Sequence, residues 1–139
     1  MKAATLLLLR LTTGLLLTIW GAIKLTAPNM SIAVSDRYYS SVLSGEAMQT
    51  PLGASQILLG VLVILGVFRA VVYPVQALVL GLSVVAIWKY IADPLGLYLL
   101  TEQTRQVLFF PSSTVFAASL VLLAFKADDR LSLGALLKR

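Results

Sequence analysis

Residues 6–25 read LLLLRLTTGLLLTIWGAIKL and contain only two charged side chains, Arg10 and Lys24. A helix needs about 20 consecutive apolar residues to cross a hydrocarbon core of about 30 Å. The run lacks the strict alternation of a barrel strand, and backbone polar groups cannot stay unpaired in lipid. It therefore predicts a transmembrane helix, which we place over residues 3–23.

Three further apolar runs follow, over residues 51–68, 70–88 and 106–125, and none of them contains a charged residue. Of the 139 residues, 59% are apolar and 12% are charged, whereas soluble domains average about 45–50% and about 25%. A soluble domain of this size exposes too much of its surface to hide so much apolar area. The sequence predicts an all-α, integral membrane four-helix bundle that forms a single transmembrane domain over residues 1–139.

The basic residues between the runs predict how the chain is oriented. Lys and Arg are more frequent in cytoplasmic loops than in outer ones. The side that holds both termini and the turn near residue 69 carries six basic residues, and the other side carries four. We therefore expect a multi-pass membrane protein with both termini in the cytoplasm.

The connection between the first two runs is long, and long connections usually contain structure of their own or are functional. Four apolar side chains in it fall on one helical face: Ile32, Tyr39, Val42 and Leu43. This pattern predicts a short amphipathic helix over about residues 30–44, lying on the outer membrane surface. Tyr38 and Tyr39 in this helix either anchor in lipid or contact a partner, so we take them as candidate interface residues.

The first run carries a regular stripe of small and charged residues. Its members are spaced 4, 3, 4 and 3 residues apart: Arg10, Gly14, Leu17, Gly21 and Lys24. Glycines on such a stripe let a neighbouring helix approach closely, so Gly14 and Gly21 are expected to face another helix. Arg10 lies either at the end of this helix contact or snorkels to the cytoplasmic head groups.

The second run contains Gln56 and Gly60, four residues apart. We assign Gly60 to helix packing. An amide in lipid needs a hydrogen-bond partner, so Gln56 is either a contact between helices or part of a polar site. Ser112, Ser113 and Thr114 are further candidates for that site, or they serve to satisfy the backbone around Pro111.

The sequence contains no Cys and no His, the common ligands of haem, iron–sulfur clusters and zinc. No acid lies within any of the four runs, whereas proton-coupled transporters usually carry one. We therefore expect no catalytic residue, no metal site and no intrinsic cofactor, and so not an enzyme. The positive charges are scattered and form no basic cluster on a polar face, so no nucleic-acid partner is expected.

Several short motifs resemble those of the DoxX-like membrane proteins. In the first run they are LRL at residues 9–11 with Gly14, Gly21 and Lys24, and in the second QILLG at residues 56–60 with LG at 65–66. RLSL at residues 130–133 is similar to the closing motif of that family. The family often has Glu where Gln56 stands and Asp where Gly134 stands. Loss of that Glu removes an acid that would bind a cation or move protons.

The resemblance implies a four-helix bundle in a bacterial cytoplasmic membrane, associated with terminal quinol oxidases, thiosulfate:quinone oxidoreduction or redox-stress complexes. We therefore favour a non-catalytic subunit, or an accessory or assembly factor, of a membrane-bound redox complex in respiratory, photosynthetic or quinone-linked electron transport. The lipid bilayer and that larger complex are the expected partners. The alternatives are a quinone-interacting component of an oxidoreductase, in which Arg10 or Gln56 contacts the quinone head group or a lipid, an assembly chaperone and a small-solute transporter. The inverted repeat that would favour a transporter is not visible in the sequence.

The orientation is tested with single cysteines, since the chain has none of its own. Ser40→Cys reports on the first connection and Ser132→Cys on the C-terminal tail. With both termini in the cytoplasm, an impermeant thiol reagent applied to the outer face should label position 40 and spare position 132. The reverse labelling pattern would contradict the orientation.

Overall fold

The computed structural model describes residues 1–137. Its elements are α1 (Lys2–Thr26), α2 (Pro28–Tyr38), α3 (Glu46–Leu65), α4 (Arg69–Ala86), α5 (Trp88–Ala92), the 3₁₀ turn η1 (Val107–Phe109), α6 (Pro111–Ala124) and α7 (Leu133–Leu136). No strand occurs in these residues, which confirms the all-α class. Four helical segments are long and apolar enough to cross a membrane: α1, α3, α4 and the stretch Val107–Ala124.

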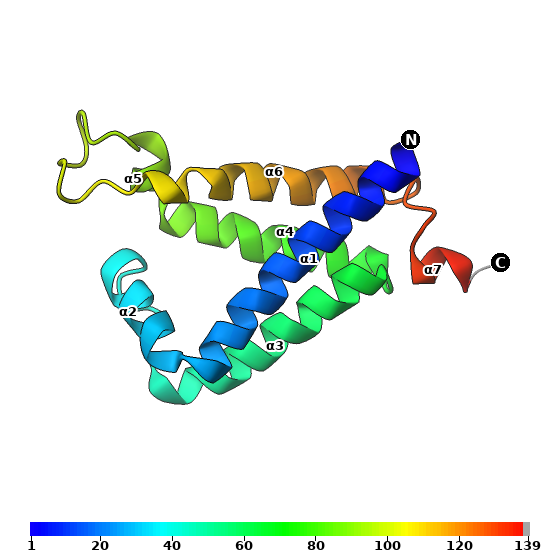
Figure 1. The fold of residues 1–139 in the computed structure, drawn as a ribbon, viewed down its shortest axis with the longest axis horizontal. Helices are drawn as coiled ribbons and strands as arrows, with labels where there is room; N and C mark the ends of the chain where they lie inside the picture. The colour runs from blue at the N-terminus through cyan, green and yellow to red at the C-terminus, as the bar shows by residue number, and fades with distance from the viewer. Residues whose placement is uncertain (138–139) are drawn as a thin grey trace.

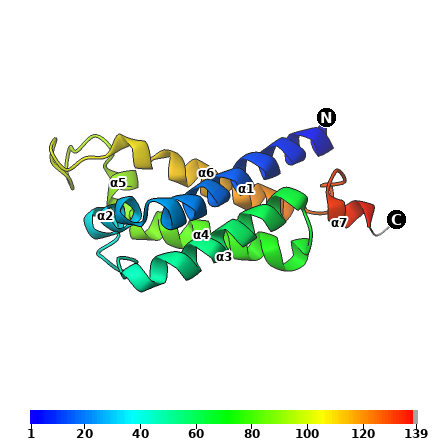
Figure 2. The same ribbon diagram turned by 60° about the horizontal axis from the view of Figure 1, so that its bottom comes forward.

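The long helices pack in two pairs, α1 along α3 and α4 along α6 (Figures 1 and 2). The N-terminus, helix α7 and the α3–α4 turn lie at one end of the molecule, which we call the terminal end. An ion pair of 3.0 Å joins Lys2 Nζ to Asp128 there. Helices α2 and α5 and the α5–η1 connection lie at the opposite end, which we call the loop end.

Helices α1 and α3 contact each other through glycines. A Cβ atom built on Gly14 would lie 2.8 Å from the carbonyl oxygen of Gly60, and one on Gly60 would lie 2.6 Å from that of Gly14. Nearer the loop end, a Cβ on Gly21 would lie 2.7 Å from the carbonyl oxygen of Gly53. The two backbones therefore lie in direct contact along the stripe of the first helix. Lys24, the last member of the stripe, stays half-buried at the loop end.

The tight turn between α3 and α4 depends on Gly66. This residue adopts a left-handed conformation with φ 66°, and its N–H donates to the carbonyl oxygens of Leu62 and Val63 at 2.9 and 3.0 Å. A helix commonly ends in this way at a glycine. A Cβ at position 66 would also lie 2.5 Å from Arg10 Nη1. Both the backbone angle and the space therefore require glycine.

The surface helix predicted over residues 30–44 is shorter than expected, because α2 ends at Tyr38. Ser40 and Ser41 follow with φ of 53° and 59°, which breaks the helical path before the predicted end. Val42, expected on the apolar face, is 71% exposed, whereas Ser31 and Ser35 are the buried side chains of the helix. The helix therefore turns its serines toward the rest of the molecule, and contact of its apolar side chains with a membrane surface stays a prediction.

The end of the third long helix also differs from the expected position at residue 88. Helix α4 ends at Ala86, and the chain restarts as the short α5 after Ile87, which is buried. Pro111 occupies the first turn of α6, where its missing N–H costs no hydrogen bond. It therefore begins a helix and does not kink one.

The structure alters one probe of the orientation test. Ser132 is fully buried, so a cysteine there would be spared from labelling in either orientation. Ala127 is exposed and lies at the same end of the chain. Ala127→Cys is therefore the appropriate tail probe, and it should label only after the membrane is permeabilised.

Larger side chains in the α1–α3 contact should destabilise the protein. Gly14→Leu and Gly21→Leu force apart backbones that are already in contact, at a cost of about 1–3 kcal/mol or more. Leu15→Phe is the control, because Leu15 lies on the same helix and is half-exposed. Thermal unfolding of the detergent-purified variants measures the difference. Equal stability of all three variants would mean that the glycines do not carry the contact.

Candidate functional site

A buried ion pair occupies the terminal end of the molecule. Arg10 is 2% exposed, and its Nη1 donates to both carboxylate oxygens of Asp129 at 3.0 and 2.9 Å. Its Nη2 donates to the carbonyl oxygen of Leu131 at 2.9 Å. Arg10 thus does not snorkel to head groups, and the carboxylate it pairs with belongs to its own chain.

Three further side chains complete this arginine–aspartate cluster. The Tyr73 hydroxyl donates to Asp129 Oδ2 at 2.5 Å, and Arg69 Nη1 lies 4.0 Å from the same oxygen. Arg69 Nη1 and Ser132 Oγ also donate to the Asp129 carbonyl oxygen, at 2.7 and 2.9 Å. One carboxylate therefore joins α1, α4 and the C-terminal segment. A buried ion pair needs such additional hydrogen bonds to offset its loss of hydration.

Sequence reasoning missed Asp129, which lies outside the four apolar runs in the polar stretch Asp128–Arg130. A signal was nevertheless present, because an arginine on an inward-facing stripe requires an acid nearby.

The packing beside this cluster also explains why residue 134 is a glycine. A Cβ on Gly134 would lie 2.7 Å from the Gly66 carbonyl oxygen, so the aspartate usual in the resembling family would not fit here.

A cavity of about 680 Å³ lies between α1, α2, α3, α4 and the η1–α6 segment. Eight of its lining side chains are polar, and they come from α1, from α2 and the residue after it, and from α3, α4 and α6: Lys24, Ser31, Ser35, Tyr39, Ser55, Gln56, Ser83 and Ser112. The structure therefore brings Gln56 and Ser112 to one cavity. Arg10 does not line it, so the two candidates for a quinone or lipid contact lie at separate places.

Two of these polar side chains have defined surroundings. The Lys24 ammonium lies 5.9 Å from the centre of the Trp20 ring, within cation–π range. Burial raises the pKa of the Tyr39 hydroxyl above its ordinary value. Tyr39 therefore stays protonated at neutral pH and is available as a hydrogen-bond donor to a molecule in the cavity.

Tyr38, the other half of the predicted interface pair, packs inside the molecule. Its ring meets Phe109 edge-on at 4.7 Å and Tyr90 at 5.3 Å between ring centres. Gln106 Nε2 also donates to its hydroxyl at 3.3 Å. These contacts fasten α2 to α5 and η1 at the loop end. A contact of Tyr38 or Tyr39 with another protein remains a prediction.

The connection after α5 is ordered by one carboxylate. Asp93 is buried and accepts four backbone N–H groups at 2.7–3.0 Å, those of Leu97, Tyr98, Leu99 and Leu100. Burial alone would raise the pKa of Asp93, but the four donors outweigh it and hold this pKa below its ordinary value. Asp93 is therefore ionised at neutral pH. Lys89 stands four residues before Asp93, a spacing that favours an ion pair on a helix, but the structure shows no such pair within residues 1–137, and the Lys89 ammonium lies over the Trp88 ring.

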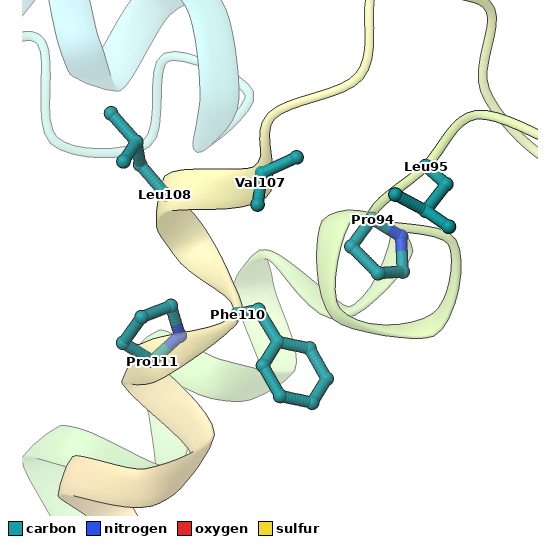
Figure 3. A pocket seen from close by; sticks show the side chains of 6 residues that line it. All are labelled: Pro94, Leu95, Val107, Leu108, Phe110 and Pro111. Atoms are coloured by element: carbon teal, nitrogen blue, oxygen red, sulfur yellow. The ribbon is translucent and has the colours of Figure 1, made fainter.

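Next to this connection lies an apolar groove of about 420 Å³ (Figure 3). Its lining residues are Pro94, Leu95, Val107, Leu108, Phe110 and Pro111. Figure 3 shows Pro94 and Leu95 across the groove from the η1 segment. Leu108 is 80% exposed, and Leu97 in the adjoining connection is 75% exposed. The loop end therefore presents apolar side chains on an ordered backbone.

Within residues 1–137, no group of three or more His, Cys, Asp or Glu side chains is placed to hold a metal ion. Comparison with family models, with curated proteins and with solved structures finds no match for this chain. The site is therefore described by its own geometry.

Loss of the Asp129 charge should strongly destabilise the fold. Asp129→Asn leaves the buried Arg10 guanidinium without a counter-charge, which typically costs about 3–5 kcal/mol. Asp128→Asn is the matched control, since Asp128 pairs with the exposed Lys2 and such surface pairs contribute about 0–1 kcal/mol. Thermal unfolding in detergent compares the two. Equal unfolding temperatures would show that the cluster contributes nothing to stability.

Proposed function

We propose that this chain is a non-catalytic accessory or assembly subunit of a membrane-bound redox complex. In this proposal it forms a four-helix bundle in a bacterial cytoplasmic membrane, with both termini in the cytoplasm. The four long apolar helices support insertion in a membrane. The resemblance of its motifs to DoxX-like proteins supports the link to respiratory, photosynthetic or quinone-linked electron transport.

The observation that carries the subunit role is the apolar connection between α5 and α6. Leu95, Leu97 and Val107 are each at least half-exposed there and lie on or beside the apolar groove. Apolar side chains are also exposed along the long helices, which lipid covers in this proposal, whereas residues 93–106 of the connection lie outside those helices. Contiguous apolar surface outside the lipid-covered helices is typical of a protein interface. We assign the groove and this connection to contact with a partner subunit.

The order of the backbone favours a protein partner over lipid. Lipid chains adapt to any apolar surface, so contact with them does not require a loop of fixed shape. The four N–H groups held by Asp93, with Arg105 Nη1 donating to the Leu95 carbonyl oxygen at 3.2 Å, fix the shape before binding. Fixing a loop in its bound shape reduces the entropy lost on association.

The arginine–aspartate cluster supports a structural and not a catalytic role for the most unusual polar residues of the chain. Arg10, Tyr73 and Asp129 are buried and bonded to one another. Their effect is to hold the terminal end of the molecule together. The loop end is then the part that remains for partner contact.

Purification in mild detergent tests the subunit role. The affinity-tagged protein should be recovered with a cofactor-containing membrane complex, recognised by its visible absorption spectrum and by mass spectrometry. Leu95→Ser and Val107→Ser should each lower the recovered complex about tenfold, since a central apolar contact is commonly worth 1–2 kcal/mol or more. Asp93→Ala should do the same by releasing the loop.

Val42→Ser is the control, because Val42 is an exposed apolar residue at the same end but does not line the groove. It should leave the recovered complex unchanged. Recovery of a lone monomer that reduces quinone when given an electron donor would replace the subunit role by an enzymatic one.

A further inference from the structure

We propose that the cavity between α1, α2, α3, α4 and α6 binds an amphiphile with an anionic head group. The head lies beside Lys24 at the loop end, and the chain extends toward the middle of the molecule between α3, α4 and α6. The volume of about 680 Å³ lies within the range of about 300–1,000 Å³ that small-molecule sites occupy. This inference rests on the cavity and does not depend on the proposed partner complex.

The polar side chains of the cavity lining lie toward the loop end, together with apolar ones such as Leu52 and Leu108, whereas the other end is lined by apolar side chains alone. Helix α1 runs toward the loop end, so Lys24 lies nearer that end than Leu16, by about 12 Å at 1.5 Å per residue. Helix α3 runs the opposite way, which places Gln56 nearer the loop end than Leu59. A long molecule with one polar end matches this division.

The remaining two helices show the same division. Along α4, Ser83 lies toward the loop end and Val75 and Val79 lie deeper. Along α6, Ser112 lies toward the loop end and Val115 lies deeper. The deep part of the cavity is thus lined by aliphatic side chains, which suit a hydrocarbon chain and offer no partner to a second polar group.

The charge of the lining selects the charge of the head group. Among residues 1–137, Lys24 is the one charged residue that lines the cavity, and no acid does. Within residues 1–137 no carboxylate lies within 4.0 Å of the Lys24 ammonium, so this charge has no ion-pair partner of its own. An anionic oxygen would supply one and would also accept hydrogen bonds from the Tyr39 hydroxyl and the Gln56 amide. A cationic head would meet repulsion instead.

Photolabelling with a fatty acid tests the proposal. The probe is palmitate carrying a diazirine at the end of its chain, added to the full chain reconstituted in nanodiscs of neutral lipid. Labelled peptides are located by mass spectrometry, and the adducts should fall on the deep segments of α4 and α6 near Val79 and Val115. Unlabelled palmitate should compete with the probe for the cavity. The corresponding alcohol should compete about tenfold less well, since a hydrogen bond to a charged group is worth about 1.5–3 kcal/mol.

Matched variants separate the site from general partition into the bilayer. Lys24→Gln should lower the labelling about tenfold, whereas Lys89→Gln should not, because Lys89 lies at the same end but does not line the cavity. Val79→Phe should fill the deep end and abolish labelling there. Val85→Phe, on the exposed face of the same helix, should leave it unchanged.

The proposal is overturned if the unmodified chain shows no adduct on the cavity segments, or if Lys24→Gln and Lys89→Gln label equally. The requirement for an anionic head would be overturned if the alcohol, or a neutral short-chain quinone, competed with the probe as well as palmitate does. If the fatty acid labels the cavity but the protein is purified without partners, the binding site is supported and only the proposed subunit role is rejected.

Discussion

The structure depends on one buried carboxylate. Asp129 accepts hydrogen bonds from Arg10 and Tyr73, and its backbone carbonyl accepts from Arg69 and Ser132. These groups come from α1, from α4 and from the segment after α6. Removing any one charge from such a group leaves the others buried without compensation, at a cost several times that of a surface ion pair. The two helix pairs are therefore joined at the terminal end by electrostatics and not by apolar contact alone.

The glycine contact and the cavity occupy different parts of the same framework. Helices α1 and α3 meet through Gly14, Gly21 and Gly60 with their backbones touching. Close packing of this kind drives the association of helices in lipid, where apolar surface gains nothing from leaving water. Toward the loop end, α2, α4 and α6 complete the wall of the cavity with polar side chains. The molecule is thus closed at its terminal end and hollow nearer its loop end.

The loop end combines order with exposed apolar surface. Asp93 fixes the connection after α5, and the rings of Tyr38, Tyr90 and Phe109 hold α2 against η1. A backbone held in this way retains its shape when its apolar side chains are exposed. The groove and the cavity share Leu108 and Pro111 in their linings. The groove and the cavity therefore adjoin each other where η1 meets α6.

The sequence by itself determined the helical class and the four long apolar helices, because the length and polarity of a run decide what can cross a hydrocarbon core. Helical spacing also placed Arg10, Gly14 and Gly21 on one stripe, since a period of 3.6 residues is a local property of the chain. The partner of Arg10 lies 119 residues away, and no local pattern encodes a pairing at that separation. For the same reason only the tertiary structure revealed that the Asp93 carboxylate turns to backbone N–H groups and not to Lys89. It also showed that Ser31 and Ser35 face inward and that Gln56 and Lys24 line one cavity, because each of these facts depends on how separate helices are packed.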